Sequence, residues 1–122
     1  MSGFVLGPGE GPAFGFHGAA VVMKASGART GGQLAVMESV YPAGLTVSEH
    51  VHAGEDEMFF LLAGQLSVFC GDDSWSATAG SFVFVPRDHP HGFTVSRADL
   101  AAAMLAAIGD PVTVRRHVAV AR

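Results

Sequence analysis

Short apolar segments of about five to eight residues follow one another along this chain, separated by glycine, proline and aspartate. The 16 glycines and 6 prolines are spread over all 122 residues and interrupt any long helical pattern. Several segments alternate with a period of two, as β-strands do. About eight to ten such strands without a convincing helix predict an all-β barrel or double-sheet roll.

The alternation is clearest in residues 33–41. One face of this segment carries leucine and valine together with Glu38, which is either a carboxylate inside the cavity or, as we expect, a strand-end residue that reaches solvent. Strands 57–63 and 80–86 are apolar on both faces. A strand of that kind lies inside a sandwich or at a contact between subunits.

Two segments do not follow this rhythm. Alanine and leucine in residues 97–108 favour a helix by propensity, but the surrounding strands favour a strand at 100–108, and we expect the strand. Residues 1–18 are rich in glycine and proline and predict an irregular arm that lays its phenylalanines on the body, with His17 at the surface. The whole chain, 1–122, is expected to form one domain.

Charge and cysteine content exclude several classes of protein. With 7 basic and 11 acidic residues the formal net charge is −4, which makes nucleic acid a poor partner. The single cysteine, Cys70, cannot form an internal disulfide and is expected to be a small core residue. No secretory signal is visible, and the longest apolar run is far shorter than the roughly 20 residues that span a bilayer. We therefore expect a cytoplasmic protein with no membrane partner.

The stretch 44–64 carries the residues most suited to chemistry. His50 and His52 are one residue apart, so on a strand they project to the same face. Glu57 follows after a short polar turn, 53–56, in which Glu55 and Asp56 are expected to be solvated. Two imidazoles and a carboxylate that converge on one face predict a metal site.

The spacing around these residues resembles the cupin superfamily. The first cupin motif is glycine, five residues, His-x-His, three or four residues, glutamate, six residues, glycine, and residues 44–64 match every element. The second motif is matched in residues 80–95 by Gly80, Pro86 and His91. Asp88 replaces the glycine before the histidine, and Val95 replaces the closing asparagine. The departures concern the geometry of the loop and leave the four ligands in place.

The resemblance implies a jelly-roll barrel in which His50, His52, Glu57 and His91 bind one divalent transition metal ion (Fe, Mn, Ni, Co, Cu or Zn). Three neutral imidazoles and one carboxylate agree with that range of metals. The alternative is that these histidines are satisfied residues of the core or rim. His89 is expected at the rim, although it could line the mouth or act as an acid or base.

The run of the sequence looks like the quercetin-dioxygenase-like cupins. This resemblance implies a metal-dependent enzyme with dioxygenase-type chemistry on a small aromatic or enolic molecule, in which Glu57 doubles as a base. The alternatives are a redox-neutral cyclase or isomerase of polyketide-like substrates, and a non-catalytic cupin that binds a metal or small ligand. Many small cupins are dimers, and the reverse face of strand 57–63 (Met58, Phe60, Leu62) fits sheet packing or a homodimer contact.

Overall fold

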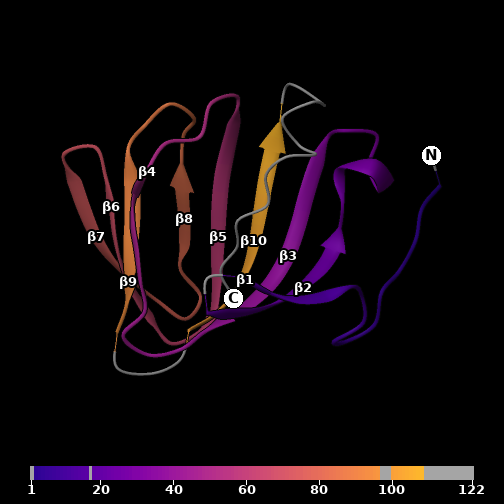
Figure 1. The fold of residues 1–122 in the computed structure, drawn as a ribbon, viewed down its shortest axis with the longest axis horizontal. Coiled ribbons are helices and arrows are strands. Elements are labelled where there is room, and N and C mark those ends of the chain that lie inside the picture. The colour runs from indigo at the N-terminus through magenta and orange to yellow at the C-terminus, as the bar shows by residue number, and fades with distance from the viewer. Residues whose placement is uncertain (1, 17, 97–99, 109–122) are drawn as a thin grey trace.

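The computed structural model describes residues 2–16, 18–96 and 100–108, which form two antiparallel sheets (Figure 1). The strands are β1 (Ala13–Phe16), β2 (Ala19–Ala25), β3 (Leu34–Tyr41), β4 (Thr46–His50), β5 (Glu55–Ala63), β6 (Gln65–Cys70), β7 (Asp73–Thr78), β8 (Phe82–Val85), β9 (His91–Val95) and β10 (Leu100–Ile108). A six-stranded sheet has the order β1-β2-β3-β10-β5-β8, and a four-stranded sheet has the order β4-β9-β6-β7. The predicted all-β jelly roll is confirmed.

Helical structure in the described residues is limited to one 3-10 turn, Gly27–Arg29. Within this part of the chain, no helix has the length and apolarity that a membrane span requires. His17 lies outside the described residues, as do residues 109–122.

The alanine-rich segment forms a strand, as predicted. β10 pairs with β3 on one side and with β5 on the other, so it lies inside the six-stranded sheet. Its backbone groups are satisfied by two neighbours, and this pairing overrides the helix propensity of alanine and leucine. Residues 97–99 lie outside the described part of the chain.

The core lies between the sheets and is built from alternate residues of each strand. In β3 the inward residues are Ala35, Met37, Ser39 and Tyr41, so Glu38 points away from the core and does not enter the cavity. In β6 the inward residues are Leu66, Val68 and Cys70, and Cys70 is a core residue as expected. Burial raises the pKa of the Cys70 thiol, with a further contribution from the charge of Asp73.

Three sequence expectations need correction. The arm is not wholly irregular, because β1 pairs with β2 and adds an edge strand to the larger sheet. β4 ends at His50, so His52 lies in the connection that follows and not on the strand. β5 begins at Glu55, two residues earlier than expected, and this shift turns part of the predicted polar turn into sheet.

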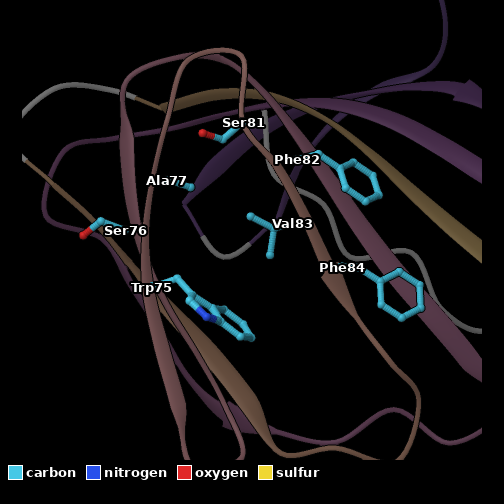
Figure 2. A pocket seen from close by; sticks show the side chains of 7 residues that line it. All are labelled: Trp75, Ser76, Ala77, Ser81, Phe82, Val83 and Phe84. Carbon is cyan, nitrogen blue, oxygen red and sulfur yellow. The ribbon is translucent and has the colours of Figure 1, made fainter.

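The outer face of β5 and β8 is apolar and exposed within one chain. Phe60 and Leu62 are 46% and 50% exposed, and Phe82 and Phe84 are 60% and 46% exposed. β8 is the free edge of its sheet. Across from it Trp75 of β7 borders a groove of about 330 Å³, with Val83 at its floor (Figure 2). The two-faced burial predicted for these strands is therefore not reached inside a single chain.

Candidate metal centre

Both sheets contribute to the cluster of histidines and glutamate. His50 ends β4 and is directly opposite His91, the first residue of β9, in the smaller sheet. Glu57 comes from β5 of the larger sheet, and His52 from the connection between β4 and β5. Each of these four residues offers a ligand atom, and all the atoms lie within 4.8 Å of one another. The structure thus brings together the four residues expected from the sequence and positions them to bind a metal ion.

Glu57 is the centre of the cluster. Its Oε2 is 2.9 Å from His91 Nε2, and its Oε1 is 3.3 Å from His52 Nε2. The rings of His50 and His91 are 4.2 Å apart between centroids. Glu57 and His91 are each 2% exposed, so the charged groups lie away from bulk solvent. A buried carboxylate among three imidazoles is stable only where cationic or proton-donating partners surround it.

The Nδ1 atoms of His50 and His91 are each held by a hydrogen bond to the backbone. His50 Nδ1 is 2.9 Å from the carbonyl oxygen of Ser48, and His91 Nδ1 is 2.9 Å from that of His89. A carbonyl only accepts, so each of these Nδ1 atoms donates its proton. The Nε2 atoms of both rings therefore point into the cluster as the atoms available to a metal, an arrangement common in metal-ligating histidines.

The contact between His91 and Glu57 affects the electrostatics of the centre. Burial acts to lower the pKa of His91, but the hydrogen bond to Glu57, the bond to His89 and the charge of Glu57 together raise it above its usual value. The pKa of His50 is lowered, chiefly by burial. A metal ion that binds here has to replace the proton between His91 and Glu57, so binding releases a proton.

The donor set and its spacing fit a transition metal ion. Three imidazole nitrogens and one carboxylate oxygen are borderline-to-hard ligands. With bonds of about 2.1 Å, two atoms on one ion are at most about 4.2 Å apart, so the widest pair here has to approach by roughly half an ångström. Small side-chain rotations supply such a movement. The four residues are therefore able to hold one ion.

Glu55 is buried and not solvated as predicted, whereas Asp56 is partly exposed and paired with Arg87. Glu55 is 1% exposed, and its Oε1 lies 3.5 Å from His52 Nδ1. Asp56 accepts hydrogen bonds from the backbone N–H and the guanidinium of Arg87, at 2.9 to 3.3 Å. These bonds hold the pKa of Asp56 below its usual value. Because β5 starts at Glu55, this residue shares the inward face of Glu57.

The loop that precedes His91 is tied to the loop that carries His52. The Asp88 N–H donates to the carbonyl of His52 at 2.8 Å, beside the Arg87–Asp56 pair. Asp88 has φ of 65°, in the left-handed region. Glycine adopts this conformation most readily, and aspartate is one of the few other residues that tolerate it. The departure from the cupin motif at this position therefore retains the backbone geometry.

An aromatic floor lies beneath the cluster. Phe93 follows His91 on the same face of β9, and its ring is 5.8 Å from Phe59 and 5.4 Å from Tyr41. Tyr41 was not singled out from the sequence, because alternation alone does not decide which face of residues 33–41 is inward. Burial raises its pKa well above the usual value, and the charge of Glu57 adds to this shift. Tyr41 therefore keeps its proton near the carboxylate.

His89 lies at the rim, as expected, and does not join the cluster. Its side chain is exposed, and its Nδ1 is 2.9 Å from the carbonyl of Arg87. Its own carbonyl is the acceptor for His91, so its backbone contributes to the centre while its side chain stays outside.

Comparison with known proteins agrees with this architecture. The sequence profile of the cupin domain family matches residues 36–108, more than half of the chain. No curated protein sequence matches the chain.

Three solved structures show the similarity of fold. KdgF from Halomonas sp. is 15% identical with a TM-score of 0.77, covering 89% of this chain and 96% of its own. A predicted oxalate decarboxylase from Thermotoga maritima is 17% identical with a TM-score of 0.76, covering 86% and 99%. The DMSP lyase DddQ from Ruegeria pomeroyi is 31% identical with a TM-score of 0.57, covering 63% of this chain and 39% of its own.

Proposed function

Because the chain belongs to the cupin family, we propose that it is a metal-dependent enzyme that acts on a small aromatic or enolic molecule by dioxygenase-type chemistry. The observation that carries this proposal is the convergence of three imidazoles, two of them anchored by backbone carbonyls, and one carboxylate next to an aromatic part of the core. Such a donor set suits Fe, Mn, Ni, Co, Cu or Zn. A bound ion of this kind supplies Lewis-acid polarisation and, when redox-active, electron exchange with substrate and dioxygen.

The residues around the centre have distinct roles in this proposal. His50, His52 and His91 would hold the ion through Nε2. Glu57 is both a ligand and the base, because its two oxygens reach different histidines and one of them can accept a substrate proton. Phe59 and Phe93 exclude water from the floor and favour an uncharged, planar substrate.

Redox-neutral chemistry is the second candidate. The 31% identical solved structure is named a lyase, and a lyase needs a base but no oxidant. The same Glu57 serves that reaction, as it would for cyclisation or isomerisation of a polyketide-like substrate. Oxygen dependence separates the two: turnover that continues under strictly anaerobic conditions excludes the dioxygenase.

Metal analysis is the first test of the proposed function. We expect the wild-type protein, after reconstitution, to hold about one divalent ion per chain, and His50→Ala and His91→Ala to hold far less. His89→Ala is the matched control, because its side chain lies outside the cluster and its backbone carbonyl is retained. Equal metal content in all four proteins would refute the metal centre.

Oxygen uptake with a panel of flavonols, quinols and polyketide-like phenols is the second test. We expect uptake in the metal-loaded wild type and in His89→Ala, but not in His50→Ala. A protein that binds one ion at the cluster and turns over none of these compounds, with or without oxygen, would support the non-catalytic binding cupin instead.

We further propose a cytoplasmic homodimer that buries the outer face of β5 and β8. Phe60 is directly opposite Phe82, and Met58 is directly opposite Phe84, so their side chains form one continuous apolar surface. β8 is an edge strand, which leaves room for a second copy beside it. A two-fold axis would bring the same surface of each copy together. The buried thiol of Cys70 is compatible with a reducing compartment.

A further inference from the structure

We propose that Glu55 is a positioning residue that orients His52 and strengthens the binding of the divalent ion. This inference deepens the proposed function and rests on it. Glu55 precedes Glu57 by two residues on β5 and shares its inward face. Its side chain is 1% exposed, and Oε1 lies 3.5 Å from His52 Nδ1. Its carboxylate lies beside His52 and outside the cluster of four ligand residues, so we infer that it acts through His52.

The three imidazoles are anchored by different groups. His50 and His91 donate to neutral backbone carbonyls, whereas His52 Nδ1 lies 3.5 Å from the carboxylate of Glu55. A carboxylate attracts the Nδ1 proton more strongly than a carbonyl does. It therefore favours the tautomer of His52 that carries its proton on Nδ1, which leaves Nε2, on the side of Glu57, free to bind the ion. It also makes His52 the most electron-donating of the three rings.

Charge balance leads to the same conclusion. With three neutral imidazoles, Glu57 alone leaves a divalent ion with one uncompensated positive charge. In this proposal Glu55 is ionised and adds a second negative charge, so that the four ligands, Glu55 and the ion together are neutral. The nearby guanidinium of Arg87 is bound to Asp56, on the opposite face of β5. A neutral assembly avoids most of the cost of keeping an unbalanced charge away from water.

Glu55 and Glu57 are two carboxylates two residues apart on one buried face, where they repel each other. A divalent ion at the centre would relieve that repulsion. The arrangement is explained if Glu55 serves a cation at the centre. Replacing it should then have opposite effects on the metal-free fold and on metal binding.

The test compares three variants with the wild type. Glu55→Gln removes the charge and keeps an acceptor, and Glu55→Leu removes both at similar volume. Glu49→Gln is the control, the same chemical change at an exposed glutamate of β4. Metal is first removed from each protein with a chelator. Zn²⁺ affinity is then measured by competition with a chromogenic chelator. The visible spectrum of the Co²⁺ form reports the ligand field at the centre.

We expect Zn²⁺ binding to weaken about 10-fold in Glu55→Gln and up to about 100-fold in Glu55→Leu, the range typical of outer-shell partners of metal ligands. Glu49→Gln should match the wild type. The Co²⁺ bands should shift in Glu55→Leu, and the melting temperature of both metal-free Glu55 variants should equal or exceed that of the wild type.

Two results would overturn the inference. One is Zn²⁺ affinity in both Glu55 variants equal to that of Glu49→Gln. The other is a loss of affinity that occurs only together with a lower melting temperature of the metal-free protein, which would show that Glu55 merely supports the fold. If the wild type and Glu49→Gln themselves fail to bind Zn²⁺ or Co²⁺, the proposed metal centre is refuted first, and the role of Glu55 is refuted with it.

Discussion

Asp88 shows how one residue can determine the path of a ligand loop. Its φ of 65° turns the chain between β8 and β9, and its N–H reaches the carbonyl of His52 at 2.8 Å. For most side chains this left-handed conformation costs about 1–2 kcal/mol because Cβ approaches the following carbonyl, while aspartate, asparagine and glycine adopt it more easily. The turn and the contact between the two loops therefore depend on a small set of residue types at this position.

We expect Asp88→Asn and Asp88→Gly to remain close to the wild type in the free energy of unfolding. Asp88→Val, which is branched at Cβ, should lower that free energy by about 1–2 kcal/mol. Urea denaturation of the metal-free proteins measures the difference. Equal stability of Asp88→Val and Asp88→Gly would show that the backbone at this position does not need the left-handed conformation.

At the scale of elements, the candidate centre depends on how tightly β9 is held between β4 and β6. Gly92 is buried next to His91, and a Cβ built there would lie 2.6 Å from the carbonyl oxygen of Val47 and 2.7 Å from two ring carbons of Phe69. Backbone on one side and an aromatic ring on the other leave no room for a methyl group. The neighbouring strands could accept one only by moving apart, which would displace His91.

Gly92→Ala should therefore lower the free energy of unfolding by about 1–3 kcal/mol and also weaken metal binding. Gly15→Ala is the control, because Gly15 lies on β1 with its nearest contact at 3.9 Å and without a left-handed φ. Thermal denaturation and a Zn²⁺ titration measure both effects. If Gly92→Ala and Gly15→Ala have the same stability and the same Zn²⁺ affinity, this account of β9 is wrong.

A salt bridge also connects the segments on either side of the centre. The Asp56–Arg87 pair joins the start of β5 to the segment after β8, next to the bond between Asp88 and His52. Asp56 adjoins Glu57 on β5, and Arg87 lies in the segment that leads to His91 at the start of β9. The pair is therefore expected to hold Glu57 and His91 at the right separation before metal binds. Its value lies in geometry, because a half-exposed ion pair contributes little to stability on its own.

Asp56→Asn and Arg87→Met should each weaken Zn²⁺ binding between about two- and fivefold. The double variant should bind Zn²⁺ as tightly as the single variant with the lower affinity, because either substitution already breaks the pair. Isothermal titration of the four proteins gives the coupling. Effects that simply add in the double variant would mean that the two side chains act independently.

At the scale of the whole molecule, the two sides of β5 have different roles. The inward side presents Glu55 and Glu57 to the metal centre, and the outward side, with β8, presents phenylalanines to solvent (Figure 2). Several large apolar side chains together on one face usually mark a site of contact with another protein. The proposed homodimer therefore uses the same strand that carries the ligand Glu57.

Replacing Phe60 and Phe84 together by serine should weaken the dimer on the order of 100-fold and give a monomer in size-exclusion chromatography with light scattering. Phe14→Ser is the control, since Phe14 is also exposed but lies on β1 at the opposite edge of the sheet. The monomeric variant should keep its metal. A wild type that is monomeric at all concentrations, or a double variant that stays dimeric, would refute the interface.

The sequence alone was sufficient for the fold class and for the four residues of the centre. Alternation identified residues 33–41 as a strand, because the side-chain period of a strand does not depend on its neighbours, but it did not decide which face is inward. The cupin-like spacing placed His50, His52, Glu57 and His91 in one group, and these residues lie together in the structure. Local geometry and a family pattern were enough for these features.

Contacts between segments distant in sequence decided the rest. Helix propensity could not show that residues 100–108 have β3 and β5 as partners, and pairing with them makes the segment a strand. The polar stretch before Glu57 was predicted to be a turn, but in the structure β5 begins at Glu55 and places this residue beside His52. The acceptors for His50 and His91 are backbone carbonyls, which every residue possesses and no sequence pattern reveals. The sequence by itself determined which atoms can bind a metal, whereas only the packing of the two sheets decided which groups hold those atoms in position, because those contacts arise from strand register and loop crossings.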